Sequence, residues 1–124
     1  MNLSLFPNNG RFIKEDGTTV NLASLLAGAT RAYLIEPTQL AVGRGIFIGC
    51  SFTSKDGASL KVYDEIVDGT LTETKRLIPD LICDSDNEAV FIFPPPHPFN
   101  EGLYIDFNIL DYVIVHYLIE EEFE

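Results

Sequence analysis

The stretch that decides the fold is LYIDFNILDYVIVHYLI, residues 103–119. In 103–107 and again in 112–119, apolar side chains recur at every second position, which is typical of strands with one buried face. The residues between them, 108–111, fit the loop of a hairpin. The sequence therefore predicts an antiparallel hairpin here and, with it, an all-β chain.

This predicted hairpin has two apolar faces. One face carries the pairs Leu103–His116, Ile105–Ile114 and Phe107–Tyr112, and we expect it to be core. The other carries Tyr104, Val113, Val115 and Tyr117. Large apolar patches on soluble domains mark interfaces, where tyrosine is enriched. Two alternatives stay open: the second face contacts a partner, or a second sheet covers it and the first face meets the partner. Both favour a homo-oligomer.

Asp-Gly pairs mark turns along the rest of the chain. Asp16-Gly17 predicts a hairpin with Ile13 opposite Val20, which makes residues 1–22 an N-terminal arm. We add Phe12 and Ile13 of this arm to the predicted interface. Residues 22–29 are a short helix candidate, and the glutamate-rich residues 120–124 form an acidic tail.

The second such pair, Asp56-Gly57, fits a three-residue loop with a left-handed Gly57. That loop sets Phe52 opposite Leu60 and Cys50 opposite Val62, so that apolar side chains share one face. Further strands are predicted over 32–35, 46–52, 80–83 and 89–93. We predict that 23–119 is one antiparallel β-sandwich of about eight strands, resembling a jelly roll.

Prolines at 94–96 and 98 separate two of the predicted strands. Because proline has no amide donor, this run ends the first strand and forms a stiff connection to the next. We expect Phe99 to anchor the connection in the core and His97 to be exposed. The run lies inside the folded region, which argues against an exposed proline-rich ligand.

Charge excludes several functions. Eight Lys and Arg against 19 Asp and Glu give a net charge of −11, which repels phosphate backbones and anionic membranes. No apolar run approaches the ~20 residues of a membrane span. Nucleic acid and membrane are therefore not expected partners. Cys50 and Cys83 do not make a disulfide framework, and we expect both to be reduced and buried.

Catalytic patterns are missing from the sequence. Two histidines, His97 and His116, accompany no nucleophile motif, so we expect no enzyme and no cofactor. Asp84, Asp86 and Glu88 have the spacing of the first ligands of a calcium loop. The glycine and the final glutamate of that loop are absent, so a solvated turn is the preferred interpretation.

Three motifs resemble small β-sandwich structural proteins of tailed bacteriophages. They are Lys61-Val62-Tyr63-Asp64, then Gly102-Leu103-Tyr104-Ile105, then Val113, Val115 and Tyr117. The resemblance covers about residues 44–118. It implies a non-enzymatic virion component, with head decoration or cement as first choice, assembled in the host cytoplasm. The implied partners are further copies of the chain, with a trimer favoured, and a major capsid or tail protein. The alternative is a tail or fibre module that recognises a host-surface glycan.

Overall fold

The computed structural model describes residues 3–8, 11–14, 19–21, 29–94 and 96–119. For residues 3–8, 11–14 and 19–21 the structure describes the backbone strands but not the side chains. The helix predicted over 22–29 lies outside the described ranges except for its last residue, as does the tail 120–124. The domain boundaries predicted at the two ends therefore stay predictions.

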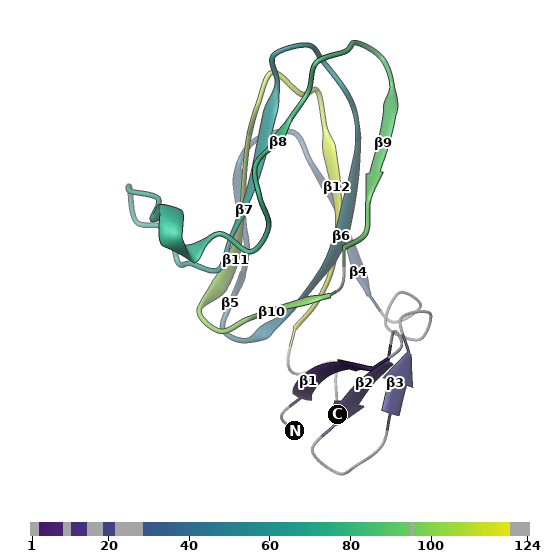
Figure 1. The fold of residues 1–124 in the computed structure, drawn as a ribbon. Coiled ribbons are helices and arrows are strands. Elements are labelled where there is room, and N and C mark those ends of the chain that lie inside the picture. Colours follow the sequence, from purple (N-terminus) through teal and green to yellow (C-terminus); the bar gives the residue numbers. More distant parts are fainter. Residues whose placement is uncertain (1–2, 9–10, 15–18, 22–28, 95, 120–124) are drawn as a thin grey trace.

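The described chain forms two antiparallel sheets that face each other (Figure 1). The first sheet has the order β4-β12-β6, with β9 and β10 both beside β6. The second has the order β5-β11-β7-β8. The strands are β4 (Thr30–Leu34), β5 (Thr38–Val42), β6 (Gly45–Thr53), β7 (Ser59–Tyr63), β8 (Leu81–Ile82), β9 (Ala89–Ile92), β10 (His97–Phe99), β11 (Gly102–Asn108) and β12 (Val113–Ile119). The predicted all-β sandwich is confirmed.

The pairing of strands follows the jelly-roll scheme. The first strand of the sandwich pairs the last, β4 with β12, and the next pair is β5 with β11. Inward from these, β6 pairs β9 and β10, and β7 pairs β8. The strands of the sandwich thus follow one long antiparallel hairpin rolled up on itself, as in a jelly roll.

The roll explains why the predicted local hairpins are wrong. Strands β11 and β12 do not pair, because they belong to opposite sheets, and the same is true of β6 and β7. Phe52 and Leu60 are both buried, as predicted, yet they come from opposite sheets rather than from neighbouring strands. Gly57 has a φ of +83°, so the predicted left-handed turn is present. An arch between sheets and a hairpin bury the same alternating residues, so the pattern alone does not separate them.

The core lies between the sheets, and β12 meets it with the face opposite to the one predicted. In β11 the predicted core residues are buried: Leu103, Ile105 and Phe107. In β12 the fully buried residues are Val113 and Val115, whereas Ile114 and His116 are partly exposed. The prediction failed because it placed β12 beside β11 in one sheet. In the structure β12 lies between β4 and β6 in the opposite sheet, and there the face with Val113 and Val115 points to the core.

The proline run separates β9 from β10, and both strands pair with β6. Ile92 of β9 lies opposite Cys50, and His97 of β10 lies opposite Phe47. Five steps along the chain, from Ile92 to His97, thus correspond to three steps along β6, from Cys50 to Phe47. The ladder is interrupted where the prolines lack amide donors. Phe99 is buried, as predicted. His97 is half-buried within β10, so the prediction of an exposed loop histidine is wrong.

A separate three-stranded sheet precedes the sandwich, with the order β1 (Leu3–Asn8), β2 (Arg11–Lys14) and β3 (Thr19–Asn21). The predicted pairing of β2 with β3 is present, but its register differs by one residue. Phe12, not Ile13, lies opposite Val20. The last pair of this ladder is Ile13 with Thr19, and five residues separate the two in the sequence. A two-residue loop would pair Ile13 with Val20, so every partner is shifted by one position.

Polar contacts join β7 to the start of β11. The Asp64 carboxylate accepts hydrogen bonds from the backbone amides of Asn100, Glu101 and Gly102, at 2.8–3.3 Å. A Cβ on Gly102 would lie 2.8 Å from the Ala41 carbonyl oxygen, so this close approach requires glycine. These contacts give a physical reason for the motif residues Asp64 and Gly102 to occur in one chain.

Removing the Asp64 carboxylate is expected to destabilise the fold. In Asp64→Ala, three backbone amides lose a charged acceptor. Because a hydrogen bond to a charged group contributes about 1.5–3 kcal/mol, we expect the free energy of unfolding to fall by at least that amount. Chemical denaturation measures the change, and Asp68→Ala, at an exposed loop position, is the matched control. Equal stability of the two variants would contradict the role given to Asp64.

An aromatic sheet face as candidate binding site

The outer face of the first sheet carries exposed apolar side chains. In each strand they alternate with core residues: Tyr33 precedes buried Leu34, and Phe91 lies between the core-packed Val90 and Ile92. We call this surface the aromatic face. It consists of Tyr33, Ile35, Phe91, Phe93, Tyr112, Ile114 and His116.

One row of the aromatic face crosses the whole sheet. Ile114 lies opposite Tyr33 on one side and opposite Ser51 on the other, and Ser51 lies opposite Phe91. Tyr33 is 66% exposed and Phe91 is 72% exposed. Such exposure is unusual for large aromatic residues on a rigid strand, and it favours a contact with another molecule.

Two contacts hold the Tyr112 end of the face in one conformation. The rings of Tyr33 and Tyr112 are stacked, with centroids 5.4 Å apart and an interplanar angle of 8°. The Tyr112 hydroxyl and the Thr53 Oγ1 are 2.8 Å apart and share a hydrogen bond. Because these side chains are already ordered, a partner that binds here loses little side-chain entropy.

At the Phe93 end, a glycine leaves room for a ring. A Cβ on Gly49 would lie 2.4 Å from the ring of Phe93, so only glycine lets Phe93 fold over β6. Its ring then lies 5.5 Å from the ring of His116, tilted by 51°. Burial, and to a lesser degree the charge of Arg31 opposite, holds the pKa of His116 below its ordinary value. The neutral imidazole therefore belongs to the apolar surface.

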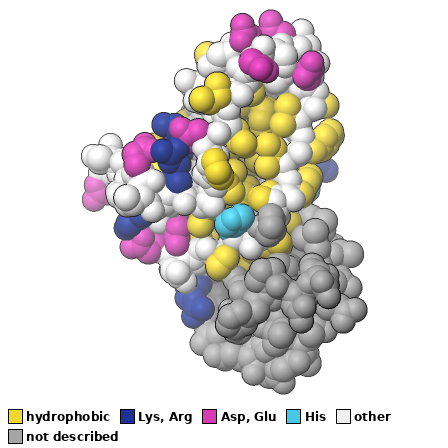
Figure 2. Space-filling model, in the orientation of Figure 1, with side chains coloured by type: hydrophobic (Ala, Val, Ile, Leu, Met, Phe, Trp, Pro, Cys, Tyr) yellow, Lys and Arg dark blue, Asp and Glu magenta, His cyan; other side chains and the backbone are white. Residues whose placement is uncertain are grey.

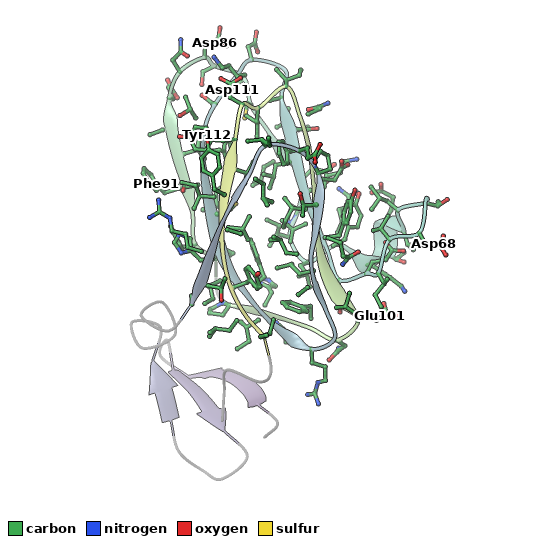
Figure 3. The ribbon with its side chains drawn as sticks, turned by 180° about the vertical axis from the view of Figure 1, so that it is seen from behind. Asp68, Asp86, Phe91, Glu101, Asp111 and Tyr112 are labelled. Atoms are coloured by element: carbon green, nitrogen blue, oxygen red, sulfur yellow. The ribbon has the colours of Figure 1, made fainter. Side chains whose placement is uncertain are left out.

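Acidic residues lie away from the aromatic face. Its ladder positions on β4, β12, β6 and β9 hold no Asp or Glu, although the chain has 19 of them. Figure 3 shows Phe91 and Tyr112 on one side of the molecule, Asp86 and Asp111 at the loop end, and Asp68 and Glu101 on the opposite side. This separation lets the face approach another surface without strong charge repulsion.

The outer face of the second sheet is different. Tyr63 is fully buried there, because residue Arg76 forms a bridge with it and its hydroxyl hydrogen-bonds to Glu73. Both partners come from the long connection around the 3₁₀ helix η1 (Glu73–Lys75), which covers this end of the sheet. Beside it, Lys61 lies opposite Asp106. Among the described residues, the long connection thus covers part of the outer face of the second sheet, whereas Tyr33 and Phe91 on the outer face of the first sheet stay mostly exposed.

The structure does not bring the predicted interface together. Val113 and Val115 are fully buried in the core, so they are unavailable to a partner. Tyr104 lies on the second sheet, and Tyr117 packs partly against the core. The side chains of Phe12 and Ile13 lie outside the described part. Alternation does mark Tyr33 and Phe91 in predicted strands, but only the sheet order places them on one face.

The candidate calcium ligands do not converge. Among the residues that the structure describes, no three Asp, Glu, His or Cys side chains lie close enough to hold a metal ion. The Asp86 carboxylate accepts from the Asp56 amide and Glu88 accepts from the Ser85 hydroxyl, as in a solvated turn. Asp84, Asp86 and Glu88 are therefore loop residues.

Both cysteines are free thiols. Cys50 is buried, as predicted, and burial raises its pKa to about 12, so its thiol is a core group without nucleophilic character. Cys83 is only half-buried, which corrects the prediction for that residue. Within the described ranges, no helix has the length and hydropathy required to cross a bilayer.

Comparison with family models, curated proteins and solved structures finds no match for this chain. The class of protein is therefore defined by its fold and its candidate site. It is a jelly-roll sandwich with an exposed aromatic sheet face.

Proposed function

We propose that this chain is a structural protein of a tailed-phage virion, with capsid decoration as first choice, and that it acts through contacts between copies rather than through catalysis. The observation that carries the proposal is the aromatic face. The jelly roll supports it, because this architecture recurs in viral capsid domains. The resemblance of the three motifs to phage β-sandwich proteins points the same way.

Self-association through the aromatic face follows from the distribution of charge. Copies with a net charge of −11 repel one another over most of their surface. The aromatic face holds no Asp or Glu at its ladder positions and carries exposed apolar side chains, so a contact there avoids close acidic pairs and buries apolar surface. Most homo-oligomers have closed symmetry, and the centres of their interfaces are rich in aromatic residues. We therefore assign Tyr33 and Phe91, the most exposed rings of the row, to the centre of the contact.

Virions from the strain that carries the gene provide the functional test. After induction and density purification, an immunoblot is expected to find the chain in the particle band, with the free protein oligomeric. A chain that is absent from particles and monomeric at high concentration would contradict the proposal.

A glycan-binding module is the second candidate, favoured by the exposed rings of Tyr33 and Phe91 on either side of the Ser51 hydroxyl. Stacking rings beside hydroxyl groups suit sugar recognition. Glycan-array binding that is lost in Tyr33→Ala, by a protein that stays monomeric, would support this function and count against decoration.

Acidification is expected to weaken assembly. The folded pKa of His116 is lowered, so the favourable contribution of the neutral ring is present above its unfolded pKa of about 6.5 and is lost as pH falls through the folded value. A partner that covers the ring adds to the cost of its charge, and Arg31 adds repulsion. Sedimentation equilibrium from about pH 7 to about pH 5 measures the dissociation constant. His116→Gln is expected to flatten the dependence, and an unchanged slope in that variant would exclude His116 as its cause.

A further inference from the structure

The open side of the sandwich, between β8 and β9, holds an apolar groove of about 360 Å³. Phe52 lines its base, Leu81 comes from β8, and Val90 and Ile92 come from β9. Leu81, Val90 and Ile92 pack against the core but are only partly buried, so the core is not closed here. Figure 2 shows the groove as a continuous hydrophobic area on this side of the molecule.

Both walls of the groove are edge strands. In the part of the chain that the structure describes, β8 pairs only with β7, and β9 pairs only with β6. A strand edge without a neighbour presents backbone donors and acceptors that a further extended segment can use. The groove therefore combines a place for apolar side chains with a backbone to pair with.

One end of the groove is acidic. Asp84 and Glu88 line it, and both are exposed. Neither forms an ion pair with any residue that the structure describes, whereas the third acid of the lining, Asp80, is paired with Arg76. Figure 2 shows acidic side chains gathered at this end, above the hydrophobic area. A bound partner would therefore contact apolar side chains along most of the groove and unpaired carboxylates at its loop end.

We propose that this groove docks an extended segment of another protein, which pairs with the free edge of β9, places alternate apolar side chains against Val90 and Ile92, and carries Lys or Arg over Asp84 and Glu88. The segment adds a strand to the first sheet. It uses the backbone edge of β9 and the inward side chains Val90 and Ile92, whereas the aromatic face uses the outward side chain of Phe91. The inference therefore goes beyond self-association and does not require it.

The test uses the full chain labelled with ¹⁵N and the capped peptide Lys-Lys-Thr-Val-Thr-Val-Thr. Amide signals of 81–83 and 89–92 are expected to shift on titration, while those of β4 and β5 stay in place. A peptide with Glu in place of both Lys is expected to bind at least about tenfold more weakly. Methylating alternate backbone nitrogens of the peptide is expected to abolish binding, because strand addition needs those donors.

Variants of the chain separate the charge contribution from general effects. Asp84→Lys with Glu88→Lys is expected to weaken binding of the basic peptide about tenfold, because two rim charges that attract the peptide then repel it. Glu36→Lys with Asp68→Lys changes the net charge equally at exposed positions outside the groove, and it should bind the peptide almost as the parent does. Absence of shifts at 81–92, or shifts that survive backbone methylation, would overturn the proposal, and neither result depends on the oligomeric state.

Discussion

Replacing Tyr33 and Phe91 together by lysine is expected to convert the proposed oligomer into folded monomers. Both rings lie in one cross-strand row and are mostly exposed in the single chain, so the substitutions leave the core intact. Truncation of a central aromatic residue costs about 2 kcal/mol or more, so the pair should raise the dissociation constant at least about a thousandfold. Sedimentation velocity over a concentration series measures this change.

The control for that experiment places the same charges elsewhere. Val42 and Ile66 are 70% and 54% exposed and lie off the aromatic face. Lysine at both of these positions is expected to leave the dissociation constant within about threefold of the parent value. If the control dissociates as well, general charge rather than the aromatic face governs assembly.

The largest effect on stability is expected from Phe99→Ala. Phe99 is 1% exposed, and its ring covers Gly45, where an added Cβ would lie 2.3 Å from it. Truncation leaves a cavity where the ring of Phe99 packs against the core, and such substitutions cost about 3–5 kcal/mol. Denaturant unfolding measures the loss, best in the Tyr33→Lys, Phe91→Lys background, where association does not contribute to apparent stability.

The control for Phe99→Ala is made in the same Tyr33→Lys, Phe91→Lys background. Ile66→Ala removes apolar atoms from an exposed loop position and is expected to change stability by no more than about 0.5 kcal/mol. A loss below about 1 kcal/mol in Phe99→Ala would mean that Phe99 does not anchor the connection after the prolines.

Alternation predicts where the strands lie, and here it is a good guide. Strands β9, β11 and β12 occur close to where the pattern indicates, and Phe99 is buried as its place among prolines suggests. Two strands of the sandwich were missed, because β5 has a mixed pattern and β10 is three residues long and contains a proline. Local sequence gives such segments no strand signal, and only their pairing with β11 and β6 makes them strands.

Pairing between strands is what the sequence does not reveal. Residues 112–119 are apolar on both faces, so Val113 and Ile114 are equally good core residues until the neighbouring strands are known. The same limit hides the aromatic face. Tyr33 and Phe91 lie far apart in the chain and meet only because the roll sets β4, β12, β6 and β9 side by side.

Native mass measurement of the unmodified protein tests most directly whether copies of this chain associate, as proposed for the aromatic face. A closed oligomer is expected at low micromolar concentration, with three copies of the 13.8 kDa chain favoured. A single 13.8 kDa species that persists as the concentration is raised would contradict it.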